Sequence, residues 1–282
     1  MKSFKTFKKI AALAFAVIVA ALPLAGCGSK QSTLGEEKTN ISYAKGSGPY
    51  TELFEEAIIP ILEKQGYTFK CVELQLNEAD VVINDGDVDL SVEQHTAYME
   101  AFNTSVKGNL VALSRIPTVP ASVFSNKHTS LDEIADGMTV AIPQDAGNMA
   151  RAMIMLQDIG WVTLKEGVNK ATASPEDVLE YNYNITIQEL NTTLIATTLD
   201  DFDYGIITGS IVAYTGLDPS TALFNENLSD EFWLQVVVKE ENKNTQWAKD
   251  VVAAYQSEEF LSWLKENNVP KYNNLWSIPE YN

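Results

Sequence analysis

Residues 141–160, AIPQDAGNMARAMIMLQDIG, contain one permanent cation in an otherwise apolar segment. Arg151 follows Asn148 by three residues, so a helix capped by Asp145 places both side chains on one face. Arg151 is the only Lys or Arg in residues 128–164. A buried guanidinium needs an anionic partner, and its planar fork fits a carboxylate. Two interpretations stay open: Arg151 binds the carboxylate of a ligand, or it pairs with a nearby Asp or reaches solvent.

Two further stretches carry side chains that suit ligand binding. EQHTAY, residues 93–98, places Glu93, His95 and Tyr98 at a predicted strand end, where ligands of open α/β sheets bind. The alternative for His95 is a plain helix cap. KGSGPY is a Gly-rich turn ending at Tyr50, which either lets backbone approach a ligand or simply joins a strand to a helix. It contains no nucleotide-binding motif.

The residue types needed for other chemistries are scarce. The chain has two histidines, His95 and His128, and no HExxH motif, so we expect no metal site. Of two cysteines, Cys71 lies in a strand-like run and is expected to be a small buried apolar residue. No nucleophile, metal or cofactor lysine stands out, so we expect neither a cofactor nor an enzyme. A net charge of −18 excludes nucleic acid as a partner.

The first residues have the pattern of a secretory signal. Lysines at the start precede an apolar run of about 13 residues, too short to span a bilayer, which needs about 20. The run ends in Leu-Ala-Gly-Cys, which resembles a bacterial lipobox, so we predict a signal peptide over 1–26 and lipidation of Cys27. Polar residues 27–39 then form a flexible tether.

The remaining chain alternates between strand and helix patterns. This order predicts an α/β fold with mostly parallel sheets flanked by helices. A stretch with two prolines, residues 113–125, interrupts the alternation and indicates a connector between two lobes. We predict that the chain crosses between lobes near 114–121 and again near 206–212. Lobe 1 is then 40–116 with 211–282, and lobe 2 is 117–210. Two crossings make a hinge with a ligand cleft between the lobes.

Several stretches together resemble the NlpA-type methionine-binding lipoproteins of bacterial ABC importers. They are Ser47-Gly48-Pro49, Gln94-His95 with Tyr98, SLDEIADGMTVAIPQDAGNMARA, LDDFDYGIITG and GLDP. The resemblance implies a type II periplasmic-binding-like clamshell that closes on a free amino acid. It also implies a receptor held by lipid on the extracytoplasmic face of the cell membrane, which delivers its ligand to a permease with a cytoplasmic ATPase.

The resemblance also implies roles for individual residues. Arg151 matches the arginine that grips the ligand carboxylate, and Asn148 matches the asparagine beside it. His95 and Tyr98 match residues that line the cleft. Relatives have Asn-Gly-Asn at the second crossing, where an asparagine helps to hold the ligand amino group. This chain has Thr208-Gly209-Ser210 at that place.

A second departure concerns the wall of the cleft. Val92 and Glu93 stand where relatives have paired phenylalanines, one of which packs the methionine side chain. A carboxylate suits a thioether poorly and an ammonium better. Methionine is the first ligand we expect, and a more polar or cationic amino acid or a short peptide is the alternative. A surface interaction lipoprotein without a transport role is the second alternative.

Overall fold

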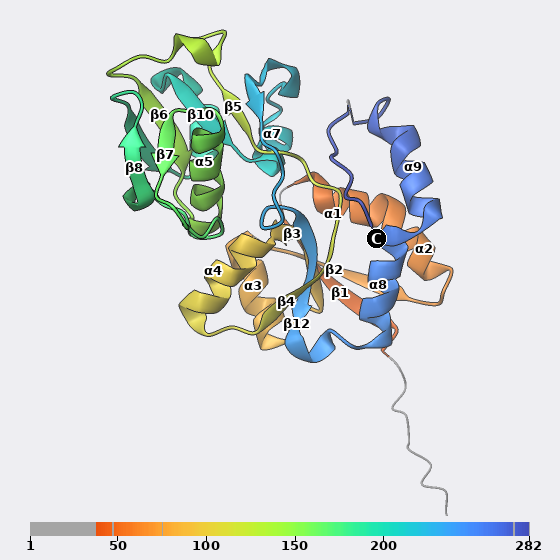
Figure 1. The fold of residues 1–282 in the computed structure, drawn as a ribbon. Coiled ribbons are helices and arrows are strands. Elements are labelled where there is room, and N and C mark those ends of the chain that lie inside the picture. The colour runs from red at the N-terminus through yellow and green to blue at the C-terminus, as the bar shows by residue number, and fades with distance from the viewer. Residues whose placement is uncertain (1–37, 47, 75, 273, 282) are drawn as a thin grey trace, which may run out of the picture. The chain divides into compact units, whose positions relative to one another are not determined.

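A computed structural model describes residues 38–46, 48–74, 76–272 and 274–281 (Figure 1). The predicted signal peptide, Cys27, most of the tether and Ser47 lie outside the described residues. Within the described ranges, no helix combines the length and the apolar character that crossing a membrane requires.

The first sheet has five strands in the order β2-β1-β3-β12-β4. Strand β1 runs parallel to β2 and β3, whereas β12 is antiparallel to both of its neighbours, β3 and β4. Every residue of the central β3 is buried, as expected for a strand covered on both faces. The bounds are β1 Asn40–Lys45, β2 Thr68–Glu73, β3 Leu90–His95, β4 Leu110–Arg115 and β12 Leu234–Lys239.

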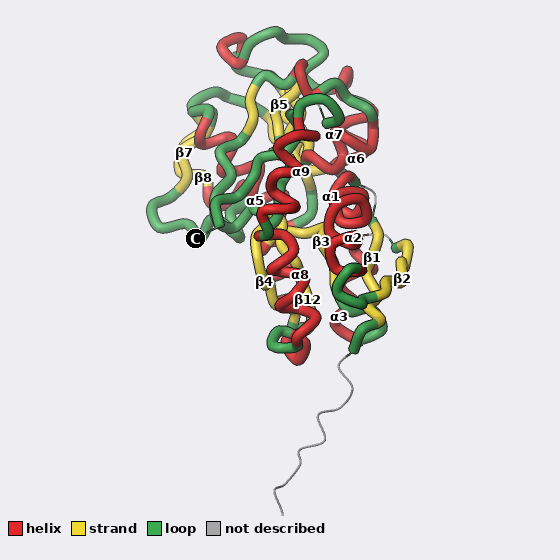
Figure 2. Tube along the Cα trace, turned by 90° about the vertical axis from the view of Figure 1, so that its right-hand side faces the viewer, coloured by secondary structure: helices red, strands yellow, loops and turns green. Residues whose placement is uncertain are grey.

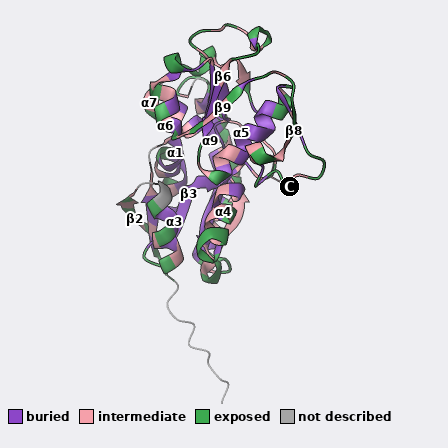
Figure 3. Cartoon of the chain, turned by 90° about the vertical axis from the view of Figure 1, so that its left-hand side faces the viewer, coloured by how far each residue is buried: buried purple, intermediate pink, exposed green. Residues whose placement is uncertain are grey.

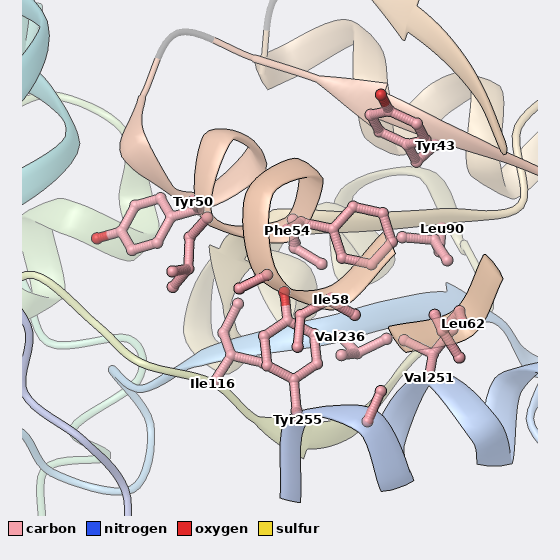
Figure 4. Close-up of a cluster of buried hydrophobic side chains, with 14 of the residues drawn as sticks. Tyr43, Tyr50, Phe54, Ile58, Leu62, Leu90, Ile116, Val236, Val251 and Tyr255 are labelled. Atoms are coloured by element: carbon pink, nitrogen blue, oxygen red, sulfur yellow. The ribbon is translucent and has the colours of Figure 1, made fainter. Parts of the chain in front are cut away.

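Helices cover both faces of this sheet. On one face, helices lie over the strands (Figure 2). There Phe54, Ile58, Val251 and Tyr255 pack on strand residues such as Val236 (Figure 4). On the other face, α3 and α4 pack over a second cluster and turn their exposed sides outward (Figure 3). The helices are α1 Pro49–Leu53, the π-helical turn Phe54–Ile58, α2 Ile59–Glu63, α3 Leu76–Asp85, α4 Thr96–Val106, α8 Gln246–Gln256 and α9 Glu258–Asn268.

One expectation about the first sheet is wrong. Cys71 is exposed rather than buried. It lies on β2, the outermost strand in the sheet order, so its side chain is less covered than those of the central strands. The strand itself was correctly predicted, but its position at the edge depends on strand order, which local sequence does not reveal.

The second sheet also has five strands, in the order β11-β5-β10-β6-β9. Strands β10, β6 and β9 are parallel, whereas β5 is antiparallel to both β10 and β11. A two-stranded pair, β7 Val162–Leu164 with β8 Val178–Tyr181, accompanies it. The bounds are β5 Ser122–Phe124, β6 Thr139–Pro143, β9 Thr186–Leu190, β10 Tyr204–Ile207 and β11 Phe224–Asn225.

The second sheet is also covered on both faces. Val140 and Ile142 belong to the cluster that includes α5, whereas Ala141 between them belongs to the cluster of α6 and α7. The helices are α5 Ala146–Asp158, α6 Thr192–Thr197 and α7 Gly209–Thr215. Short 3-10 turns occupy Leu131–Glu133, Pro175–Asp177, Leu199–Asp201, Pro219–Thr221 and Glu240–Asn242.

The chain passes from the first sheet to the second within residues 116–121, between β4 and β5. It returns within 226–233, between β11 and β12, and not near 206–212 as expected. Strand β10 is central to the second sheet, and Val212 of α7 is buried in that lobe's core, so the chain adds α7 and β11 there before it returns. The two-residue β11 shows no periodicity in the sequence.

Candidate ligand-binding site

All eight residues predicted to bind a ligand line one small cavity. Those from the first lobe lie at the start of α1, the end of β3 and the start of α4. Those from the second lobe lie at the start of α5 and where β10 meets α7. The eight are Tyr50, Glu93, His95, Tyr98, Asn148, Arg151, Thr208 and Ser210, and Gln94, Gly209 and Leu234 complete the lining. The carboxyl ends of parallel strands therefore build the cavity, as in other open α/β sheets.

The cavity is small. Its volume is about 30 Å³. A single water needs roughly 10–15 Å³ by this measure, so the cavity has room for two or three waters and not for an amino acid. An amino acid can enter only if the lobes move apart, and the two chain segments that join the sheets are the place for that motion.

Helix α5 explains the apolar segment around Arg151. Asp145 caps it, accepting from Asn148 N at 3.0 Å, as predicted. The helix packs against its own sheet on one side and against α4 of the first lobe on another. At Gly147 a Cβ atom would lie 2.8 Å from Tyr98 Cα, so only glycine permits this approach of the two lobes.

Arg151 is buried and pairs with Glu226. Arg151 Nε lies 2.9 and 2.8 Å from the two carboxylate oxygens of Glu226, and Nη2 also donates to Glu226 Oε1. Each side chain is 3% exposed. Burial alone lowers the pKa of Arg151, but the charge and hydrogen bonds of Glu226 outweigh it and raise that pKa. The partner is therefore neither a nearby Asp nor solvent.

Glu226 is a site residue that the sequence analysis missed. It follows β11 and also accepts from Ala121 N at 2.5 Å, so it links both chain segments that join the lobes. It lies 75 residues from Arg151 in sequence and is one of 38 acidic residues. No spacing or periodicity singles it out.

Arg151 still has one nitrogen available. A guanidinium has five N–H donors. Glu226 uses donors on Nε and Nη2, whereas Nη1 makes no hydrogen bond to the residues that the structure describes. Glu226 thus fixes the plane of the guanidinium and leaves Nη1 for a further acceptor.

His95 joins the two lobes in its neutral form. Its Nδ1 accepts from Tyr98 N at 3.1 Å and caps α4, so the ring proton of the neutral form resides on Nε2. His95 Nε2 lies 3.0 Å from Asn148 Oδ1 and donates to it. Burial first, and then the Arg151 charge, lowers the pKa of His95 to about 3. His95 is therefore both a helix cap and a cavity residue.

Tyr50 turns its hydroxyl away from solvent. The hydroxyl accepts from Val119 N at 3.2 Å and lies 3.4 Å from Val119 O. Val119 belongs to the first segment between the lobes, so Tyr50 anchors that segment. Thr208 Oγ1 and Ser210 Oγ lie 3.5 Å apart on the opposite side of the cavity.

Behind the cavity wall, Gln94 Nε2 donates to Asp80 Oδ1, and each residue is 1% exposed. Asp80 Oδ2 and Gln94 Oε1 have no hydrogen-bond partner within the described ranges. Burial raises the pKa of Asp80 to about 7. A proton on Asp80 turns one of its acceptors into a donor, so this pair is best satisfied in the protonated form.

The comparison with known proteins decides the family. The model of the NlpA lipoprotein family matches residues 43–276. This chain belongs to the NlpA lipoprotein family. The D-methionine-binding lipoprotein MetQ of Salmonella typhi is 30% identical over 263 residues, which cover 91% of this chain and 92% of the relative.

Solved structures of similar proteins share the fold. A lipoprotein from Ruminococcus gnavus is 29% identical with a TM-score of 0.77 and covers 86% of this chain and 100% of its own. A nutrient-binding protein from Burkholderia cenocepacia bound to methionine is 25% identical with a TM-score of 0.76 and covers 85% and 100%. The predicted two-lobed periplasmic-binding-like fold is confirmed. The NlpA family is a group of substrate-binding lipoproteins and not a class of enzymes.

Proposed function

We propose that this protein is the lipid-anchored, extracytoplasmic substrate-binding protein of an ABC importer, and that it captures an amino acid between its lobes. The observation that carries the proposal is the cavity itself: residues from both lobes, which the sequence predicted to bind a ligand, line one small space. The family and the names of relatives support the transport role. Relatives are named for binding methionine, which makes methionine one candidate ligand. A more polar or cationic amino acid is the other candidate, because Glu93 lines the cavity.

The geometry supports a closing mechanism. In an open form the ligand binds one lobe, and closure brings His95 of the first lobe to Asn148 of the second. The ligand carboxylate accepts from Arg151 Nη1, while Glu226 keeps the guanidinium in place. Thr208 and Ser210 offer hydroxyl oxygens from the start of α7. No bond of the ligand is broken, and the loaded closed form is what a permease recognises.

Calorimetric titration of the soluble domain with single amino acids tests this function. We expect saturable one-to-one binding of at least one amino acid. Binding should be lost in Asn148→Ala, because that change removes the inter-lobe bond to His95 Nε2 without leaving a buried charge. Absence of binding by every amino acid, or undiminished affinity in Asn148→Ala, contradicts the proposal.

A further inference from the structure

Glu93 is a buried carboxylate without an ion-pair partner in the described part of the chain. The residue is 8% exposed and lines the cavity. Its Oε1 accepts from Thr51 N at 3.0 Å and from Thr51 Oγ1, which ties one oxygen to the start of α1. Its Oε2 accepts no hydrogen bond from the described residues. Burying a carboxylate in this way costs free energy unless a cation or a donor joins it.

Lys45, whose charge acts on Glu93, is already engaged by another carboxylate. Lys45 lies on the strand that leads to the Gly-rich turn, but its Nζ pairs with Glu55 Oε2 at 2.7 Å. The other cation at the cavity, Arg151, is neutralised by Glu226. His95 is uncharged, since burial lowers its pKa to about 3. The side chains at the cavity, with Glu226 counted against Arg151, therefore sum to one negative charge when Glu93 is ionised, and that charge has no ion-pair partner among the described residues.

The free oxygen of Glu93 lies where the two lobes meet. A Cβ atom at Gly48 would be 3.2 Å from Glu93 Oε2 and 3.2 Å from Ser210 Cβ. A Cβ atom at Gly46 would be 3.5 Å from the same oxygen. Gly46 and Gly48 thus both lie close to this carboxylate, and Gly48 lies equally close to Ser210 of the second lobe. A ligand group held there contacts both lobes.

We propose that Glu93 Oε2 binds a side-chain ammonium of the ligand, so that this receptor selects an amino acid with a second amino group over a neutral one such as methionine. The inference rests on the proposed function, since it concerns the occupant of the same cavity. The ligand carboxylate accepts from Arg151 Nη1. The ammonium of the ligand side chain supplies the ion pair that Glu93 lacks among the described residues. A neutral side chain leaves Glu93 buried and unpaired, which disfavours closure.

Glu93→Gln is the decisive variant because it separates charge from structure. The glutamine amide oxygen still accepts from Thr51 N, so the start of α1 keeps its hydrogen bonds. Only the negative charge is removed. Glu100→Gln, on the exposed side of α4, is the matched control, because it removes one charge from the same lobe outside the cavity.

The experiment is calorimetric titration of the wild type and both variants with lysine, ornithine, methionine and norleucine. We expect the wild type to bind lysine or ornithine at least about tenfold more tightly than norleucine, since a charge-assisted contact has that size. Glu93→Gln should lose that preference while its affinity for norleucine changes little. Glu100→Gln should behave as the wild type.

The outcomes distinguish this inference from the proposed function. If the wild type binds methionine or norleucine more tightly than both diamino acids, the inference is wrong and the amino-acid receptor stands. If Glu93→Gln weakens all four ligands equally, Glu93 binds the α-ammonium and the selectivity claim is also wrong. If the wild type binds a diamino acid and Glu93→Gln binds it equally well, Glu93 is only a cap of α1. If no amino acid binds, both proposals fail.

Discussion

Both carboxylate oxygens of Glu226 accept hydrogen bonds from Arg151 Nε, at 2.9 and 2.8 Å. The two residues come from different parts of the second lobe, Arg151 in the second turn of α5 and Glu226 just after β11. Because Glu226 also accepts from Ala121 N, the pair ties α5 to both segments that join the lobes. Arg151, for which the sequence left a ligand carboxylate and a nearby Asp both open as partners, is thus a structural link at the hinge.

The first prediction concerns the cost of separating this pair. Glu226→Ala leaves a buried guanidinium unpaired, so we expect it to lower the free energy of unfolding by about 3–5 kcal/mol. The double variant Arg151→Met with Glu226→Leu should recover most of this loss, since two apolar side chains fill the space without charge. Urea unfolding measures both. If the free energy of unfolding of Glu226→Ala lies within about 1 kcal/mol of the wild-type value, the pair is not a buried one.

The second prediction concerns the close approach at Gly209. A Cβ atom there would lie 2.4 Å from Val119 Cγ1 and 2.5 Å from Val119 O. Gly209→Ala should therefore displace the first inter-lobe segment and destabilise the protein by about 1–3 kcal/mol. Thermal unfolding measures the loss. Adding Val119→Ala should not rescue it, because the backbone oxygen remains in place, and full rescue would show that only side chains meet there.

The third prediction concerns Asp80. Its pKa is raised to about 7 in the folded protein, above the ordinary value of 3.8. The folded state therefore binds the proton more tightly, and stability falls as pH rises from about 4 to about 7, by up to roughly 1.4 kcal/mol per pH unit. Asp80→Asn keeps an acceptor for Gln94 and removes the titration. We expect the difference in unfolding free energy between variant and wild type to grow over this window and to level off above it. A constant difference contradicts the shifted pKa.

The fourth prediction concerns His95, whose effect has the opposite sign. Its pKa is lowered to about 3 from 6.5, so the unfolded state binds the proton more tightly between these values. The contribution of neutral His95 to the free energy of unfolding is complete above about pH 6.5 and is lost as the pH falls toward 3. In the wild type this slope opposes that of Asp80, so Asp80→Asn should expose a steep loss of stability in acid. His95→Gln in the Asp80→Asn background should flatten it, and an unchanged acid slope would show that His95 is not the group responsible.

The parts of the molecule that were predictable are those with local signals. The cap at Asp145, the helix that carries Asn148 and Arg151, and the strand ending at His95 each follow from spacing within a few residues. The order of strand and helix patterns then brings these ends to one side of their sheets. For this reason side chains chosen from separate stretches of sequence line one cavity.

The parts that were not predictable depend on contacts between distant segments. Glu226 is one acidic residue among 38, and only the fold brings it to Arg151. The second passage between lobes follows a two-residue strand, which has too few residues to show a period. Cys71 is exposed because β2 ends the sheet, and strand order is a property of the whole lobe.

Titration of the double variant Arg151→Met with Glu226→Leu against the amino acid that the wild type binds tests the central claim most directly. This variant is expected to fold, because the ion pair is removed as a unit. It lacks the Nη1 donor for a ligand carboxylate, so the account predicts that binding is lost while the unfolding free energy stays near that of the wild type. Undiminished binding in the folded double variant would contradict the claim that the cavity beside Arg151 holds the ligand.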